Sequence, residues 1–98
     1  MTGRVRLDVN FEEFQRHLFE LDAGELRQVI KTFRKIASLD WSTLYRDRGL
    51  KWEAIKSSEK GHYSIRLSQQ CRAVVARDGD FLCFLALHRD HDAAYGKK

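Results

Sequence analysis

The chain has 98 residues, 43% of them hydrophobic, and its 18 lysines and arginines outnumber 14 aspartates and glutamates to give a net charge of +4. This length suits one domain with one core, and the composition excludes a disordered chain. Residues 46–98 carry the whole positive excess, whereas acidic and basic side chains balance in residues 1–45. A localised positive field indicates a polyanionic partner, most commonly a nucleic acid; a basic surface without a partner is the alternative.

A strand and a helix are the first elements in chain order. Residues 4–9 alternate hydrophobic and charged side chains, which predicts a strand toward an edge of the sheet. Asn10 followed by Glu13 is typical of a capped helix N-terminus, and apolar residues recur at helical spacing: Phe11, Phe14, Leu18 and Leu21. Since residues 1–9 lack the apolar stretch of a signal peptide, we expect a cytoplasmic protein with no membrane partner.

A second, longer helix follows the same capping pattern at Asp22 and Glu25. Its apolar residues have the spacing of a helix packed on one side: Leu26, Val29, Ile30, Phe33, Ile36 and Ala37. Asp40 is expected to cap one more helical turn. Two successive amphipathic helices need an apolar surface to cover, so we expect both to lie on one face of the sheet.

The second half of the chain is predicted to be strand. In residues 50–55 the side chains that face one side of a strand alternate with those that face the other, and a polar loop follows at 56–62. Residues 63–67 alternate hydrophobic and polar side chains, and residues 71–77 are apolar and β-branched, so both segments are predicted to be strand. The chain then reverses, and residues 81–87 are predicted to form an internal strand. The short connections favour antiparallel pairing. The predicted fold is a single α+β domain over residues 1–98: strand, helix, helix, strand, strand, strand.

Asp78-Gly79 predicts a tight turn, because Gly adopts the positive φ that a type I′ turn needs. A two-residue loop at this position sends Cys71 and Cys83 to opposite faces of the hairpin, so we expect two free thiols. Without CxxC spacing, these cysteines argue against a zinc site, and we expect no cofactor.

The candidate functional residues are cations, histidines and a tyrosine on the strands and at the C-terminal end: Lys51, Lys56, Arg66, Arg72, His88, Arg89, His91 and Tyr95. A guanidinium within an apolar strand needs an anionic or carbonyl partner. For Arg66 and Arg72 that partner is either a ligand phosphate or an internal carboxylate such as Glu53. For His91 and Tyr95 the alternative to catalysis is a surface position near a chain terminus.

These groups suit cleavage of an RNA phosphodiester by its own 2′-hydroxyl. The reaction needs a base, an acid, and positive charge around the phosphate in the transition state. Histidine serves as acid or base near neutral pH, and arginine binds two phosphate oxygens at once. No metal is required by this mechanism.

Five segments carry a resemblance to a known family: Gly49-Leu50-Lys51-Trp52-Glu53-Ala54-Ile55, Tyr63-Ser64-Ile65-Arg66-Leu67, Cys71-Arg72-Ala73-Val74-Val75, Asp78-Gly79-Asp80 and His91-Asp92-Ala93-Ala94-Tyr95. Together they resemble the RelE/ParE superfamily of bacterial toxins. The resemblance implies a RelE-like β-α-α-β-β-β fold and the toxin of a type II toxin-antitoxin system, an mRNA interferase that cuts ribosome-bound messages and inhibits translation.

The resemblance also implies roles for the candidate residues. It makes Arg66 and Arg72 candidates for phosphate binding and places Arg89, His91 and Tyr95 in the segment that carries acid and base groups. Together with the cations noted above, we expect catalysis by Arg72, Arg89, His91 and Tyr95, and substrate binding by Lys51, Lys56, Arg66 and His88. The implied partners are a cognate antitoxin and mRNA on the ribosome, with DNA reached only through the antitoxin. Two alternatives are a ParE-like toxin that inhibits gyrase and an inactive member that binds antitoxin or RNA. The C-terminal histidine and tyrosine favour the ribonuclease, since gyrase binding does not need them.

Overall fold

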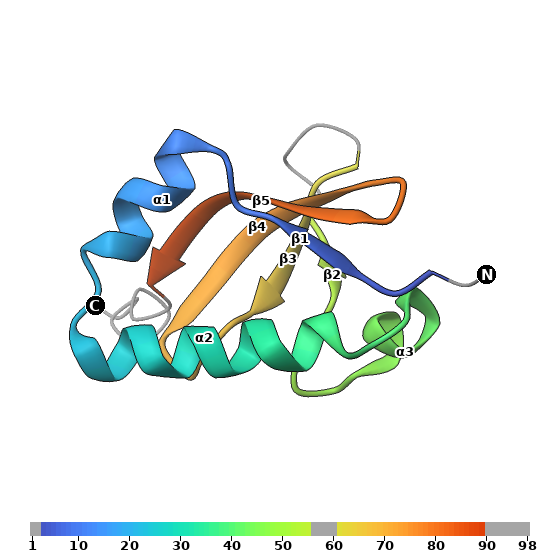
Figure 1. Cartoon of the computed structure of the whole chain (residues 1–98), viewed down its shortest axis with the longest axis horizontal. Helices are drawn as coiled ribbons and strands as arrows, with labels where there is room; N and C mark the ends of the chain where they lie inside the picture. The colour runs from blue at the N-terminus through green and yellow to red at the C-terminus, as the bar shows by residue number, and fades with distance from the viewer. Residues whose placement is uncertain (1–2, 56–60, 90–98) are drawn as a thin grey trace.

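The computed structural model describes residues 3–55 and 61–89. Its elements in chain order are β1 (Arg6–Asp8), α1 (Glu12–Phe19), α2 (Ala23–Ala37), α3 (Trp41–Arg46), β2 (Glu53–Ala54), β3 (Tyr63–Arg66), β4 (Cys71–Asp78) and β5 (Phe81–Arg89) (Figure 1). The predicted α+β class is confirmed. Residues 63–77 form two strands instead of one, so four strands follow the helices. No helix within the described ranges is long and apolar enough to span a bilayer.

The strands form one sheet in the order β1-β5-β4-β3-β2. β1 runs parallel to β5, and the remaining neighbours are antiparallel. β1 is therefore an edge strand, as predicted, and β5 is internal. The predicted strand over residues 50–55 shortens to Glu53–Ala54, because Lys51 has a left-handed backbone with φ 51° that interrupts the extended chain.

Two of the three predicted helix caps are confirmed. Asp22 accepts the backbone N–H of Glu25 at 2.8 Å, and the Asp40 carboxylate accepts a backbone N–H at the start of α3. The predicted Asn10 cap is wrong. Its own N–H donates to the Asp8 carboxylate at 3.0 Å, and this turn after β1 delays the helix, whose N-cap is Phe11 without a side-chain hydrogen bond.

The β4–β5 hairpin differs from the prediction in its turn type. Gly79 has φ +64°, but Asp80 does not share a positive φ, so the loop has the pattern of a type II′ turn instead of type I′. The register shifts between Val74 and Val75, where β5 bulges. Both cysteines are free, as predicted: Cys71 is buried, and the less buried Cys83 contacts Asp8 on the other face.

Both helices cover the same face of the sheet, as predicted. Phe14 from α1, Phe33 from α2 and Phe84 from β5 meet there, with ring centroids 5.1–6.3 Å apart. Val29 and other apolar residues of the helices and strands complete the core. The predicted stripes have exceptions: Ile30 is 44% exposed and Phe11 is 46% exposed, and Ala37 at the end of α2 is also exposed. The opposite face of the sheet has no described helix on it.

Candidate functional site on the open face of the sheet

Three side chains form a row across the face that the helices leave open. Arg66 of β3 lies directly opposite Arg72 of β4, which in turn lies opposite His88 of β5. Paired residues in a sheet point to the same face, and the alternating neighbours Ile65 and Ala73 are buried under the helices. The row therefore faces away from the core. The structure thus brings together three of the residues selected from the sequence.

Arg72 is held in position by two neighbours. Its Nε and Nη2 donate to the Ser64 hydroxyl at 3.1 and 2.9 Å, and Nη2 lies 3.4 Å from Glu53 Oε1. Its side chain is 22% exposed, whereas that of Glu53 is 58% exposed. Nη1 has no hydrogen-bond partner within the described residues. The guanidinium is thus oriented by the protein while one nitrogen remains for a ligand oxygen.

Arg66 anchors the other end of the row. Its Nη1 donates to the backbone oxygen of Gln69 at 3.1 Å, and its backbone N–H donates to the oxygen of Leu50 at 2.8 Å. The second bond places the backbone of Lys51, which follows Leu50, beside this strand. Lys51 itself is exposed. A third predicted substrate-binding residue therefore borders the row.

The arrangement of charges favours an anion. Like charges directly opposite each other on a sheet are destabilising, typically by about 0.2–1 kcal/mol. Arg66 and Arg72 are such a pair, and the Glu53 carboxylate contacts Arg72. Two cations on adjacent strands suit a phosphate ligand.

Glu53 is the member of the site that the sequence prediction did not include. It was considered only as an internal ion-pair partner of the arginines, and the ion pair with Arg72 is present. Because it is exposed on the open face, it is also a carboxylate within reach of a bound phosphate. Its pairing with Ser64 in the β2–β3 register gives it this position, and the alternation of residues 50–55 indicates the same face.

Arg89 does not join the row. It lies opposite the buried Cys71, on the helix-covered side, and its guanidinium contacts the Glu25 carboxylate of α2. Strand alternation sends it away from its neighbour His88. The remaining predicted residues lie outside the described residues: Lys56, His91 and Tyr95.

The two cysteines and His17 add no nucleophile or metal ligand to this site. Burial raises the pKa of the Cys71 thiol, and burial together with the Asp8 carboxylate raises that of Cys83, so both thiols are protonated at neutral pH. His17 lies on the helix side of the sheet, in a pocket with Leu87. No group of three potential metal ligands occurs within residues 3–55 and 61–89.

The order of the elements and the single covered face define a RelE-like toxin fold. Solved structures share it. The Helicobacter pylori protein HP0894 is 23% identical, with a TM-score of 0.61 over 87% of this chain and 93% of its own. A chain of the RelB-RelE antitoxin-toxin complex from Methanococcus jannaschii is 14% identical, with a TM-score of 0.56 over 96% and 100%. A chain of the E. coli DinJ-YafQ complex is 15% identical, with a TM-score of 0.54 over 94% and 99%. No protein-family model and no curated protein sequence matches the chain.

Proposed function

We propose that this chain is the toxin of a type II toxin-antitoxin system and that it cleaves mRNA on the ribosome, which inhibits translation. The observation that carries the proposal is the row of Arg66, Arg72 and His88 beside Glu53, on the open face of a RelE-like fold. RNA supplies both the phosphate that the arginines fit and the neighbouring 2′-hydroxyl that cleavage needs. Because translation takes place in the cytoplasm, we propose a cytoplasmic protein.

In the proposed reaction Glu53 takes the proton from the 2′-hydroxyl, whose oxygen then forms a bond to phosphorus. The bond from phosphorus to the 5′-oxygen breaks, and His88 protonates the leaving oxygen, which leaves a 2′,3′-cyclic phosphate and a 5′-hydroxyl. Arg72 stabilises the charge that builds on the phosphate. Arg66 and Lys51 bind the adjacent backbone. His91 and Tyr95 remain candidates for the acid, and no step needs a metal.

The proposed partner is a cognate antitoxin encoded beside this chain. Two structures of the same fold come from complexes described as RelB-RelE antitoxin-toxin and DinJ-YafQ toxin-antitoxin. An antitoxin that covers the open face would displace RNA and neutralise the toxin. Any association with DNA is proposed to occur through the antitoxin.

Expression of the chain in bacteria tests the function. We expect incorporation of labelled methionine to stop before incorporation of thymidine, and primer extension to map cuts within translated messages. Purified chain should cut mRNA only when ribosomes are added. The Arg72→Gln variant is the matched control and should neither arrest growth nor cut.

Arrest of DNA synthesis first, without mRNA cuts, would overturn the ribonuclease in favour of a gyrase-directed toxin. Growth without arrest, in cells that accumulate folded wild-type chain, would overturn the toxin itself.

A further inference from the structure

Two hollows border α2 on the flank that faces the β3–β4 turn. The larger has a volume of about 400 Å³ and is lined by Gly24, Glu25, Gln28, Ser68, Gln69 and Gln70. The smaller, of about 190 Å³, has Thr32, Gly49 and Arg66 in its wall. Ser68 and Gln69 line both, so the two hollows meet at the turn. We name the larger one the glutamine hollow.

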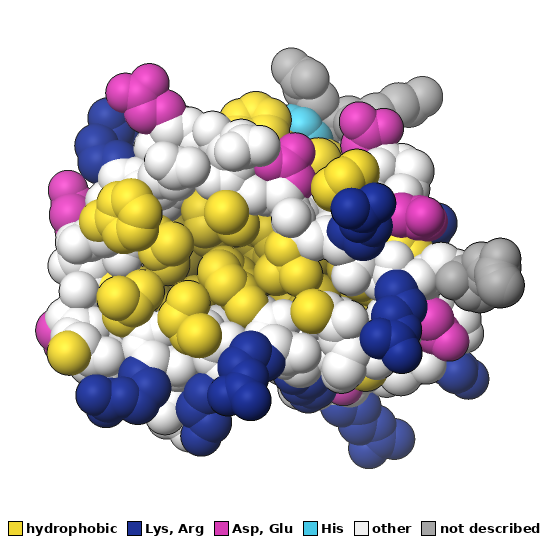
Figure 2. Space-filling view, in the orientation of Figure 1, with side chains coloured by type: hydrophobic (Ala, Val, Ile, Leu, Met, Phe, Trp, Pro, Cys, Tyr) yellow, Lys and Arg dark blue, Asp and Glu magenta, His cyan; other side chains and the backbone are white. Residues whose placement is uncertain are grey.

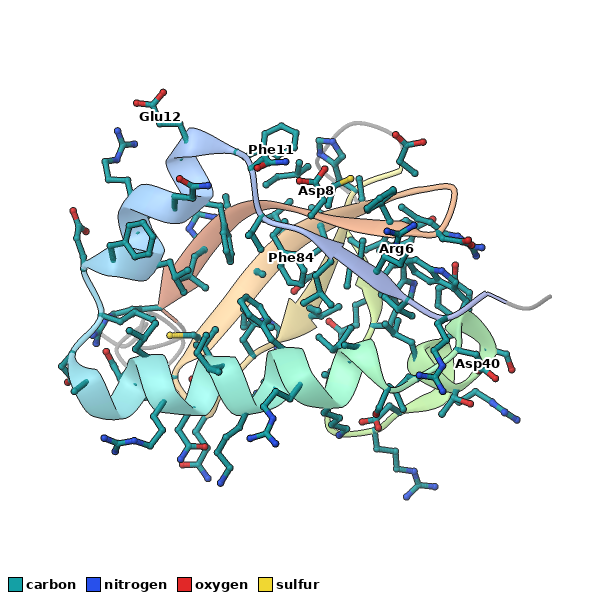
Figure 3. The ribbon with its side chains drawn as sticks, viewed as in Figure 1. Arg6, Asp8, Phe11, Glu12, Asp40 and Phe84 are labelled. Atoms are coloured by element: carbon teal, nitrogen blue, oxygen red, sulfur yellow. The ribbon has the colours of Figure 1, made fainter. Side chains whose placement is uncertain are left out.

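The two flanks of α2 differ because successive helical residues are 100° apart. On the flank toward α1, Phe84 lies in the core between the two helices (Figure 3) and contacts a phenylalanine of each. On the opposite flank, Gln28 and Thr32 are one helical turn apart, and the Thr32 hydroxyl donates to the backbone oxygen of Leu67 at 2.7 Å. This bond ties the flank to the residue that follows β3. The glutamine hollow therefore lies outside the core, at the edge of the sheet.

Arg66 connects the two hollows to the row of phosphate-binding side chains. It belongs to that row through its pairing with Arg72, and it lies in the wall of the smaller hollow. Its Nη1 donates to the backbone oxygen of Gln69, a residue that lines both hollows. An RNA strand whose phosphate contacts Arg66 thus has a hollow within reach for one of its bases.

The glutamine hollow offers hydrogen-bonding groups that the protein does not use itself. The side-chain amides of Gln28 and Gln70 form no hydrogen bond with other described residues, and both residues are exposed. Each amide has donor and acceptor groups. The Glu25 carboxylate, by contrast, contacts Arg89, so its charge is compensated. A ring with donors and acceptors along one edge fits these amides better than a second phosphate, which has acceptors only.

The rim of this hollow is positive on the side of α2. Lys31 is three residues after Gln28 and four before Lys35, so these three side chains share one side of the helix. Lys31 is exposed and forms no ion pair within the described part of the chain. Figure 2 shows basic side chains along the outer side of α2, below the hydrophobic group between the helices. A polyanion is attracted to such a rim, whereas a neutral metabolite is not.

We propose that the glutamine hollow binds one nucleobase of the RNA that Arg66 holds, with the side-chain amides of Gln28 and Gln70 hydrogen-bonded to the edge of that base. Proteins read single-stranded RNA by such contacts to exposed base edges. Glutamine forms paired hydrogen bonds with adenine, so adenine is the expected base. The hollow would thereby determine where messages are cut, and that part of the inference rests on the proposed function.

Binding of short RNA to the purified chain tests the hollow apart from catalysis. The probes are fluorescent hexamers of 2′-O-methyl adenosine and 2′-O-methyl uridine, which carry equal numbers of phosphates and have no 2′-hydroxyl to attack. We expect the wild type to bind the adenosine hexamer about tenfold more tightly, as is typical of a bidentate contact. Gln28→Ala/Gln70→Ala should bind both hexamers alike. Asn10→Ala, which removes an exposed amide between β1 and α1, should keep the difference.

Gly24→Leu fills the hollow without removing its amides. A Cβ at Gly24 would meet only Asp22 Oδ1, at 3.5 Å, so the fold accommodates the substitution, and the new side chain lies one turn before Gln28. This variant should lose the preference for adenosine. Ala23→Leu in the same turn is the matched control, because Ala23 is exposed and lines neither hollow. Circular dichroism melts establish that each variant folds.

Equal affinity of the wild type for the two hexamers would overturn the inference, as would an adenosine preference that survives in Gln28→Ala/Gln70→Ala and in Gly24→Leu. Mapping of cuts in expressed messages separates the inference from the proposed function. If the wild type and these variants cut messages with the same base preference, the hollow does not read the base, and the ribonuclease stands. If the hexamers behave as expected but no message is cut, the hollow is an RNA-binding site, and the proposed ribonuclease fails.

Discussion

Nη2 of Arg72 lies 3.4 Å from Oε1 of Glu53, although β3 separates the two strands that carry these residues. An ion pair exposed to this degree contributes at most about 1 kcal/mol to the free energy of unfolding. The contact therefore matters less for stability than for orientation, because it holds a carboxylate and a guanidinium where one phosphodiester can meet both.

Glu53→Gln is expected to remove the proposed general base. Cleavage of mRNA on the ribosome should fall about a hundredfold or more, as is typical for a general base. Thermal unfolding should change little, because the carboxylate is mostly exposed. Glu20→Gln, which neutralises an exposed glutamate at the end of α1, is the control. Unchanged cleavage by Glu53→Gln would leave only an ion-pair role for this residue.

Arg89→Gln tests whether Arg89 is catalytic, as the family resemblance implies, or structural, as its position on the helix-covered side indicates. Since Arg89 contacts Glu25 on the helix-covered side, we expect cleavage close to that of the wild type. Its side chain is 44% exposed, so the decrease in Tm should be small. Arg72→Gln should instead lose cleavage. Loss of cleavage by Arg89→Gln at an unchanged Tm would restore its predicted catalytic role.

Arg66→Gln should weaken RNA binding for all sequences alike. Removing one phosphate contact reduces the slope of log K against log salt by about 0.7 for a single strand. Fluorescence anisotropy with a short RNA oligonucleotide at several salt concentrations measures this slope. Gln69→Ala keeps the backbone oxygen that Arg66 contacts and serves as the control. A full slope with lower stability would indicate that Arg66 has a structural role.

His91→Ala and Tyr95→Phe test the C-terminal residues selected from the sequence. If either is a general acid or base, cleavage should fall about a hundredfold or more in that variant, with normal folding and antitoxin binding. Both are compared with His88→Ala in a single-turnover assay with ribosomes. Full activity of the double variant, together with loss of activity in His88→Ala, would assign the acid to the row on the sheet.

The two thiols should differ in reactivity. Cys71 is 0% exposed, so it should react with a thiol reagent only after unfolding, whereas the less buried Cys83 should react slowly in the native protein. Because the thiolate is the reactive form and both pKa values are raised, the native rate at Cys83 should continue to rise above pH 9. We expect two reactive thiols per chain in the denatured, unreduced protein. A count of zero would reveal a disulfide.

Much of the fold could be predicted from local patterns. Asp22 and Asp40 cap helices because their carboxylates reach the backbone N–H groups of the next turn, a rule that depends only on nearby sequence. Asn10 fits the same pattern, but α1 begins one residue later with Phe11 as its N-cap, and the backbone N–H of Asn10 donates to the Asp8 carboxylate. The bulge at Val74/Val75 has no comparable local signal.

The candidate site was predictable only in part. Alternation within β5 separates His88 from Arg89. Arg66 and Arg72 come together through the register of β3 with β4, which alternation alone does not give. Which strands are neighbours is a tertiary property, so the approach of Glu53 to Arg72 could not be deduced from their positions in the sequence. The left-handed backbone at Lys51, which shortens β2, also arises from how the chain enters the sheet.

The parallel pairing of β1 with β5 has a consequence for when the protein becomes folded. Residues Arg6–Asp8 pair with Phe81–Cys83, so the first strand to be synthesised has its sheet partner in the last strand of the described sheet. Contacts between such distant segments close a large loop and slow folding. During synthesis β1 has no sheet partner until β5 has left the ribosome. His88 lies near the end of that same strand, so the row of phosphate-binding side chains is completed only after the helices and the other strands have emerged.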